Sequence, residues 1–201
     1  MYLSRLELDI RNIFVRNALT NCQEMHKLIM RGFQNIESNE ARKEMGALYR
    51  VVSNTKCVLV YVQSKVKPCW ENEKSNAINY FEVKDTSKII ECFEVGRIYN
   101  FNILTFPFKR TNNKRYFLRN ANERLEWLQR KAEQSGFQIL SVREEDNGVL
   151  QGIKGERNTG FSTINYIGTL KVTDKELFIK AYTNGLGVEK AYGLGLLLLS
   201  I

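Results

Sequence analysis

The spacing of hydrophobic residues along the chain changes between the two-residue period of a strand and the longer period of a helix. The second half of the chain shows this most clearly. It predicts, in order, a strand, a helix, two strands joined by a long hairpin, a second helix and a last strand. This is the order of a ferredoxin-like domain, in which an antiparallel sheet carries two helices on one face. The elements are expected at 98–106, after 120, at 137–142 and 149–172, at 175–182 and at 194–200.

Capping residues support both helices of this half. Asn120 and Glu123 have the spacing of a capping box, and Gly136 stands where a glycine commonly ends a helix. Asp174 is expected to cap the second helix. The buried face of the first helix is expected to contain Leu125, Leu128 and Ala132.

The first half begins with the same order of elements. A strand is predicted from Tyr2 to Ile10, a helix from about Asn21, and strands at 48–52 and 56–63 on either side of a turn at Ser53-Asn54. The buried stripe of this helix is expected to contain Met25, Leu28, Ile29, Phe33 and Ile36.

The pattern from 65 to 91 is weak and fits a short helix and a strand, and Val95-Gly96-Arg97 then marks a turn. We therefore predict an α+β fold with two tandem ferredoxin-like (RRM-like) domains, 1–94 and 95–201. The sheet of such a domain is a familiar platform for single-stranded RNA.

Charge and composition narrow the class of partner. The chain has 201 residues, 30 of them Lys or Arg and 22 Asp or Glu, and its net charge of +8 favours a polyanion, with nucleic acid before an anionic membrane surface. The four cysteines form no CxxC pair, and acidic residues and histidine do not cluster at ligand spacing. The start lacks the apolar run of a signal peptide. We expect a soluble cytoplasmic protein that uses no metal or other cofactor.

Two basic segments are candidates for phosphate binding. From Phe101 to Asn122 there is no acidic residue. The cations in this predicted loop either pair with distant carboxylates or bind phosphates, and the positive net charge of the chain favours phosphate binding. Lys154 and Arg157 flank the tip of the long hairpin, where charge serves either solubility or contact with an RNA duplex. The cations of the loop are Lys109, Arg110, Lys114, Arg115 and Arg119.

Four glycines and a lysine lie close together near residue 190. They do not form a dinucleotide-binding fingerprint, because they follow a predicted helix and precede a strand. Two interpretations stay equal on physical grounds: a helix C-cap with a flexible turn, or a loop whose backbone approaches phosphates. The residues are Gly185, Gly187, Lys190, Gly193 and Gly195.

His26 is the only histidine in the chain. It follows Met25 and is expected at the edge of the helix's buried stripe, where a side chain can be half-buried and still reach a ligand. An imidazole has an ordinary pKa of about 6.5, which suits proton transfer near neutral pH. A lone histidine is nevertheless more often structural than catalytic.

Four stretches together resemble one known family. "GLGVEKAYGLGLLLLSI" is similar to the terminal glycine-rich motif of the CasE family of CRISPR-associated endoribonucleases, and "EMHKLIM" resembles the early helix that carries the family's catalytic histidine. "MYLSRLELD" is similar to its opening strand, and "NERLEWLQRKAEQSGFQIL" to a helix and strand of its second domain. The likeness runs in order from Met1 to Ile201 and is weakest between 65 and 95.

This resemblance implies a metal-independent endoribonuclease that cleaves CRISPR precursor RNA within repeat stem-loops. The 2′-OH of the RNA would attack its own phosphate to leave 5′-hydroxyl and 2′,3′-cyclic phosphate ends. The enzyme would stay bound to the mature crRNA hairpin as a subunit of the type I-E Cascade complex, with other Cascade subunits as partners and no membrane.

The resemblance also assigns roles to residues. His26 is the expected catalyst, with Lys27 and Lys190 as possible stabilisers of phosphate charge. The family has a tyrosine three residues before the histidine, where this chain has Gln23, which can donate a hydrogen bond but does not readily transfer a proton. The alternative is therefore an RNA-binding subunit of the same type with weak or no catalysis. The expected RNA-binding residues are Lys109, Arg110, Lys114, Arg115, Lys154, Arg157, Gly185, Gly187, Lys190, Gly193 and Gly195.

Overall fold

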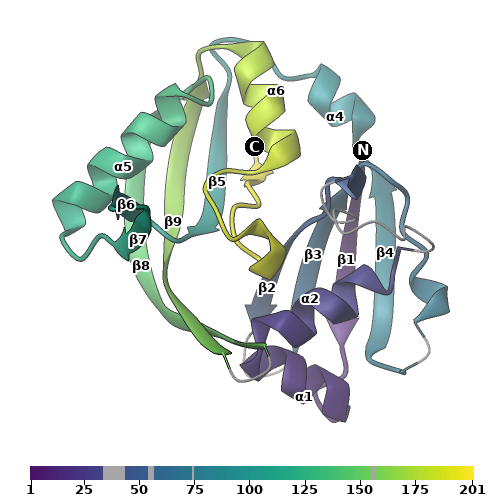
Figure 1. Cartoon of the computed structure of the whole chain (residues 1–201). Helices are drawn as coiled ribbons and strands as arrows, with labels where there is room; N and C mark the ends of the chain where they lie inside the picture. The colour runs from purple at the N-terminus through teal and green to yellow at the C-terminus, as the bar shows by residue number, and fades with distance from the viewer. Residues whose placement is uncertain (34–43, 54–56, 74, 155–156) are drawn as a thin grey trace. The chain divides into compact units, whose positions relative to one another are not determined.

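The computed structural model describes residues 1–33, 44–53, 57–73, 75–154 and 157–201. The chain forms two compact units, each built from more than one segment (Figure 1). Unit 1 comprises Met1–Ile89, Gln151–Gly160 and Lys190–Gly193. Unit 2 comprises Ile90–Leu150, Phe161–Glu189 and Leu194–Ile201. The predicted division into domains 1–94 and 95–201 stays a prediction.

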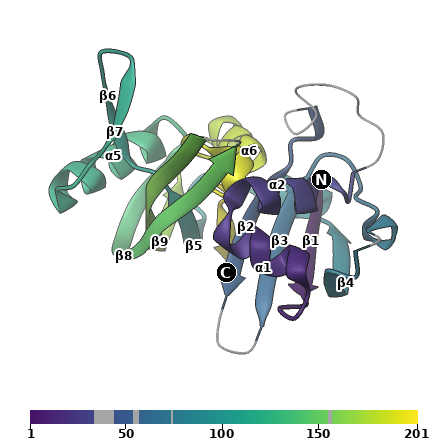
Figure 2. The ribbon, with the colours of Figure 1, turned by 60° about the horizontal axis from the view of Figure 1, so that its bottom comes forward.

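Unit 1 contains a four-stranded antiparallel sheet in the order β2-β3-β1-β4. The first two helices lie across one face of this sheet (Figure 2). This is the ferredoxin-like strand order, in which the first strand lies between the third and the fourth. The elements are β1 (Tyr2–Leu8), α1 (Ile13–Thr20), α2 (Cys22–Met30), β2 (Leu48–Ser53), β3 (Val58–Ser64), the 3₁₀ helix η1 (Trp70–Asn72), β4 (Ile78–Asp85) and α4 (Ser87–Glu91).

Alternation along the strands forms the core of unit 1. Leu6 and Leu8 of β1 point to the same face as Val58, Val60 and Val62 of β3, and all five are buried. The helices complete this core with Val15, Ala18, Met25, Leu28 and Ile29. The predicted stripe of the second helix is thus confirmed within α2, and Phe33 is also buried, although the helix ends at Met30. Ile36 lies outside the described residues.

Unit 2 repeats the same arrangement with the strand order β10-β5-β9-β8. β5 lies between β9 and β10 and pairs antiparallel with both. The two units therefore form the expected tandem ferredoxin-like fold. The elements after α4 are β5 (Ile98–Thr105), β6 (Phe108–Thr111), β7 (Lys114–Phe117), α5 (Ala121–Glu133), β8 (Phe137–Lys154), β9 (Arg157–Val172), α6 (Lys175–Asn184), the 3₁₀ helix η2 (Lys190–Tyr192) and β10 (Leu198–Ser200).

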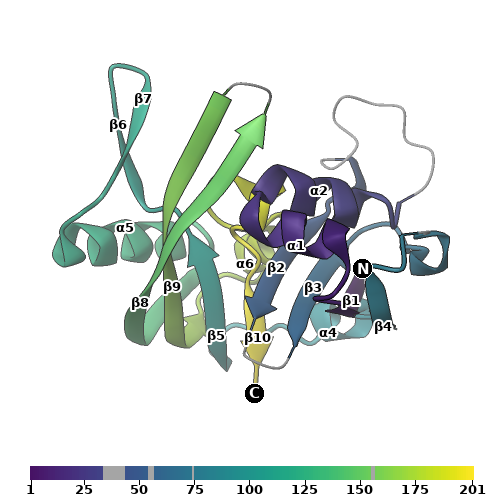
Figure 3. The ribbon, with the colours of Figure 1, turned by 90° about the horizontal axis from the view of Figure 1, so that it is seen from below.

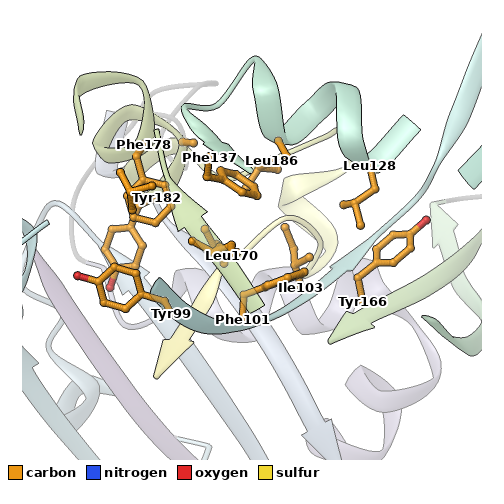
Figure 4. Packing of buried hydrophobic residues seen from close by; sticks show 14 of the residues in the cluster. Tyr99, Phe101, Ile103, Leu128, Phe137, Tyr166, Leu170, Phe178, Tyr182 and Leu186 are labelled. Carbon is orange, nitrogen blue, oxygen red and sulfur yellow. The ribbon is translucent and has the colours of Figure 1, made fainter. Parts of the chain in front are cut away.

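Aromatic residues dominate the core of unit 2 (Figure 4). Phe178 of α6 meets Phe93 edge to face, with ring centroids 5.0 Å apart, and lies parallel to Tyr99 at 6.2 Å. Burial raises the pKa of Tyr166 and Tyr182 because the phenolate cannot be solvated there. The aromatic packing thus joins α6 to the sheet.

Three expectations for unit 2 need correction. Leu125 is 36% exposed, whereas Trp127 is 2% exposed, because the buried face of α5 contains Trp127, Leu128 and Ala132, and residues two apart on a helix do not share a face. The last strand begins at Leu198 rather than Leu194, although Leu194 is fully buried. The predicted basic loop is a hairpin, β6–β7, whose turn residues Asn112 and Asn113 both have positive φ.

The first half also differs from expectation in one respect. Helix α1 precedes α2, and no helix was predicted between Ile13 and Thr20. Asn12 caps α1 by accepting a hydrogen bond from the backbone N–H of Phe14 at 2.9 Å. The helices of the described ranges are all too short or too polar to cross a membrane.

Candidate functional site

Helix α2 positions His26 at the border of the unit 1 core. The helix begins at Cys22 because the side chain of Asn21 accepts a hydrogen bond from the backbone N–H of Gln23 at 3.0 Å. Met25 is buried and Lys27 is exposed, and His26 between them is half-buried with its Nδ1 atom buried. His26 is thus held by the packed helix while part of the residue stays accessible.

A segment from the end of the chain lies beside α2 in unit 1. The 3₁₀ helix η2 holds Lys190 and Tyr192, and the Gln23 side-chain amide donates a hydrogen bond to the Tyr192 hydroxyl at 2.7 Å. Gly193 follows with φ +85°, and a Cβ there would lie 2.8 Å from the ring of Tyr49 in β2. A side chain at position 193 would therefore force η2 away from the sheet.

The tip of the long hairpin also belongs to unit 1 and is attached to the start of α2. Asn21 accepts a hydrogen bond from the Ile153 N–H at 3.1 Å and donates one to the Ile153 carbonyl at 3.3 Å. Gly152 allows this approach, since a Cβ there would lie 2.8 Å from the Sγ of Cys22. Lys154 and Arg157 therefore end β8 and begin β9 in the same unit as His26.

The two lysines assigned to phosphate charge have different surroundings. Lys27 is exposed and forms an ion pair with Glu24 at 2.7 Å, one turn earlier on α2. Such a surface pair contributes only about 0.3–0.5 kcal/mol, so a phosphate can replace the carboxylate at little cost. Lys190 is half-buried in η2, two residues before Tyr192.

The basic segment of unit 2 is the hairpin β6–β7, called the basic hairpin below. Figures 2 and 3 show it projecting from the sheet and α5 of unit 2. Its two-residue turn has φ of 49° at Asn112 and 60° at Asn113, as a type I′ turn requires. Arg110 and Arg115 stand directly opposite each other on the two strands. Like charges in this position repel each other, and a bound anion would relieve the repulsion.

Carboxylates neutralise part of this charge. Arg115 pairs with Glu189 at 2.5 Å and lies over the ring of Phe108, and Lys109 approaches Glu123 at 3.7 Å. Within the described part of the chain, no carboxylate forms an ion pair with the other three cations of the segment. These are Arg110, Lys114 and Arg119, all of them exposed.

The remaining glycines of the C-terminal segment belong to unit 2. Gly185 ends α6 with φ 72°, and its N–H donates to the Ala181 carbonyl at 2.8 Å, as the C-cap interpretation requires. The backbone of Gly195 bonds to Leu186 and Leu104, and a Cβ at 195 would collide with the Leu186 carbonyl. A Cβ at Gly187 would make only ordinary contact with the Trp127 ring. RNA binding by these glycines stays a prediction.

Three features of the site were not expected from the sequence. They are the hydrogen bond from Gln23 to the Tyr192 hydroxyl, the hydrogen bond from the Ile153 N–H to Asn21, and the position of the hairpin tip in unit 1. Tyr192 follows Lys190 in a segment already singled out, but nothing local indicates that it meets α2. Among the described residues, no group of three or more His, Cys, Asp or Glu side chains is arranged to hold a metal ion.

Fold and site together define a tandem ferredoxin-like α+β protein with one histidine on an early helix and a basic hairpin. A family model described as "CRISPR associated protein" matches residues 1–200. The chain belongs to this CRISPR-associated protein family, as the resemblance in its sequence predicted.

Individual relatives agree with this assignment. The chain is 25% identical to the CRISPR-associated endoribonuclease Cse3 of Thermus thermophilus, over 98% of both chains. A structure of Cse3 bound to a 19-nucleotide RNA matches with a TM-score of 0.85 and 25% identity over the whole of both chains. Cas6e of Escherichia coli K-12 shares the fold, with a TM-score of 0.73 and 19% identity over 100% of this chain and 99% of that one.

Proposed function

We propose that this protein is a metal-independent endoribonuclease that cleaves CRISPR precursor RNA within repeat stem-loops. The observation that carries the proposal is the full-length match to Cse3 bound to RNA, together with a histidine on an early helix of unit 1. The basic hairpin adds independent support, because Arg110 and Lys114 are exposed there and form no ion pair with a carboxylate among the described residues.

The proposed reaction uses only the RNA and the protein. The 2′-oxygen forms a bond to the adjacent phosphorus as its proton passes to a base. The bond from phosphorus to the 5′-oxygen breaks, and that oxygen takes up a proton. The products are a 2′,3′-cyclic phosphate and a 5′-hydroxyl, and no water is consumed.

His26 is the proposed group for proton transfer, because an imidazole exchanges protons near neutral pH. Lys190 and Lys27 are proposed to offset the charge that gathers on the phosphate oxygens. Lys190 is supported by its place in η2, which lies against α2. Gln23 contributes a hydrogen-bond donor and no proton transfer.

Binding of the stem-loop is assigned to the basic segments. The exposed cations of the basic hairpin are proposed to contact RNA phosphates and release counterions, with Lys154, Arg157 and the glycine-rich segment as further contacts. The protein is proposed to keep the product hairpin and to join other Cascade subunits. A chain of a CRISPR RNA-guided surveillance complex has the same fold, with a TM-score of 0.67 and 20% identity.

The test uses a stem-loop RNA with the CRISPR repeat sequence of the host, in the presence of EDTA. A control RNA carries a 2′-deoxy nucleotide at the cleavage position. We expect the first RNA to be cut and the second to be bound equally tightly but left intact, with cyclic phosphate on the upstream product.

Other outcomes separate the alternatives. Tight binding of both RNAs without any cleavage would indicate an RNA-binding subunit and would overturn the enzymatic proposal. Cleavage that stops in EDTA would overturn metal independence. Purification gives a further check, because a CRISPR RNA-processing enzyme should carry one discrete small RNA population rather than a mixture.

A further inference from the structure

We infer that Tyr192 is a catalytic residue of the proposed cleavage, with its phenolic O–H donating a hydrogen bond to a non-bridging oxygen of the scissile phosphate. Gln23 is the positioning residue that holds the phenol. The inference rests on the proposed function and names a residue whose local sequence carries no catalytic signal.

The first argument is the placement of the hydroxyl. Gln23 and His26 are three residues apart on α2, and side chains at this spacing are neighbours on a helix surface. The Gln23 amide reaches the Tyr192 hydroxyl at 2.7 Å, although the two residues are 169 positions apart in sequence. The phenol therefore lies on the part of α2 that carries His26.

The second argument is the direction of the hydrogen bond. The Gln23 amide donates and the Tyr192 oxygen accepts, so the contact with Gln23 does not use the phenolic O–H. A hydroxyl that accepts one hydrogen bond is a stronger donor in the next. A phosphate oxygen that gains negative charge during the reaction is the kind of acceptor such a donor stabilises.

The third argument is rigidity. Gly193 lets the backbone after Tyr192 lie against the buried ring of Tyr49 in β2. The hydroxyl is thus held by the Gln23 amide, and the backbone that follows it lies against Tyr49 of the sheet. Lys190 lies two residues earlier in η2, so one short segment carries both a cation and a hydroxyl. Donors held in place before the reaction cost no reorganisation during it.

A competing explanation is that the hydrogen bond only attaches η2 to α2. Tyr192→Phe distinguishes the two, because it keeps the ring and removes the hydroxyl. We expect single-turnover cleavage to fall about 100-fold, the effect of losing one donor to a developing oxyanion, with unchanged affinity for the uncleaved RNA. The matched control is Tyr80→Phe on β4, a tyrosine that is 52% exposed, and it should cleave at the wild-type rate.

A sulfur substitution in the RNA tests the contact itself. One phosphorothioate diastereomer at the scissile phosphate should slow the wild-type protein about 10-fold or more, because sulfur accepts hydrogen bonds poorly. The same diastereomer should have little effect on Tyr192→Phe, whose contact is already lost. Gln23→Leu should lower the rate less than Tyr192→Phe, because the hydroxyl stays but is no longer held.

The outcomes separate this inference from the proposed function. A wild-type protein that does not cleave refutes both. If the wild type cleaves and Tyr192→Phe cleaves equally well, only the role of Tyr192 is refuted. A Tyr192→Phe protein that loses RNA binding or melts at lower temperature with an unchanged sulfur effect has lost a structural contact, which also refutes the inference.

Discussion

Helices α2 and α5 both precede the second strand of their sheet, and both begin after an asparagine. Asn120 accepts hydrogen bonds from the backbone N–H groups of Asn122 and Glu123 in its own helix. Asn21 caps α2 in the same way but also binds both backbone groups of Ile153 in the hairpin. An asparagine N-cap therefore begins both helices, but the one before α2 also binds a segment that is distant in sequence.

The far ends of the two helices differ as well. Arg31 is the C-cap of α2 and pairs with Glu73 at 3.2 Å, and the Glu73 side chain is only 2% exposed. Gln134 is the C-cap of α5, and its side chain accepts a hydrogen bond from Lys131 on the surface. α2 is therefore held at both ends, which suits a helix that carries the proposed catalytic histidine.

The largest expected difference concerns the fifth residue after each asparagine, which is His26 in α2 and Leu125 in α5. We expect His26→Ala to slow cleavage by a factor of about 10²–10⁴, the usual contribution of a general acid or base, with RNA affinity retained. Leu125→Ala is the matched control and should cleave normally. Single-turnover rates measure both, and equal losses in the two variants would contradict the assignment of His26.

The basic hairpin gives the next largest effect. Arg110→Ala combined with Lys114→Ala should weaken binding of the uncleaved stem-loop. The negative slope of log K against log salt should become shallower by about 1.5, because two phosphate contacts are lost. The control is Lys84→Ala on β4, a lysine that is exposed and paired with Glu82. Titrations at several salt concentrations measure the slope, and an unchanged slope in the double variant would remove the hairpin from the RNA interface.

The carboxylate at the end of α2 should affect stability in a pH-dependent way. Burial acts to raise the pKa of Glu73, but hydrogen bonds from Ser75, Ala77 and Arg31 outweigh it and hold the pKa below its ordinary value of 4.5. The ionised group therefore stabilises the fold above pH 4.5, and this contribution is lost as the pH falls through the lowered pKa.

Glu73→Gln should accordingly lower the free energy of unfolding by about 2 kcal/mol at pH 7, with a smaller difference from wild type in acid. Urea denaturation at several pH values measures this. Glu82→Gln on β4, where the ion pair is exposed, should change stability by less than about 0.5 kcal/mol. A Glu73→Gln deficit that is the same at every pH would show that the charge is not responsible.

The smallest effect separates the two asparagines. Serine caps a helix as well as asparagine does, so Asn120→Ser should be nearly neutral. Asn21→Ser keeps the cap but loses the two hydrogen bonds to Ile153, which should cost about 1 kcal/mol more. Hydrogen exchange at the backbone amides of α2 and of the hairpin measures the loss. Equal protection in the two variants would show that the hydrogen bonds between Asn21 and Ile153 add no stability.

Much of the fold follows from local patterns, and the site follows from them only in part. Periodicity and capping residues located α2, α5, α6 and the long hairpin, because each depends on neighbours in sequence. The same patterns placed Leu125 on the buried face, since they did not distinguish it from the neighbouring face that contains Trp127. His26 could be chosen by its chemistry, whereas the contacts from Gln23 to Tyr192 and from Asn21 to Ile153 join residues too distant for any local pattern to predict.

The segmented make-up of unit 1 has a consequence for the order in which the protein is made. During translation α2 emerges early, but the hairpin tip follows more than a hundred residues later, and η2 later still. The nascent chain therefore displays His26 long before Lys190 and Tyr192 exist. A ribosome-bound chain stalled before residue 190 has the histidine without its neighbours, so the proposed activity should arise only when synthesis has passed residue 193.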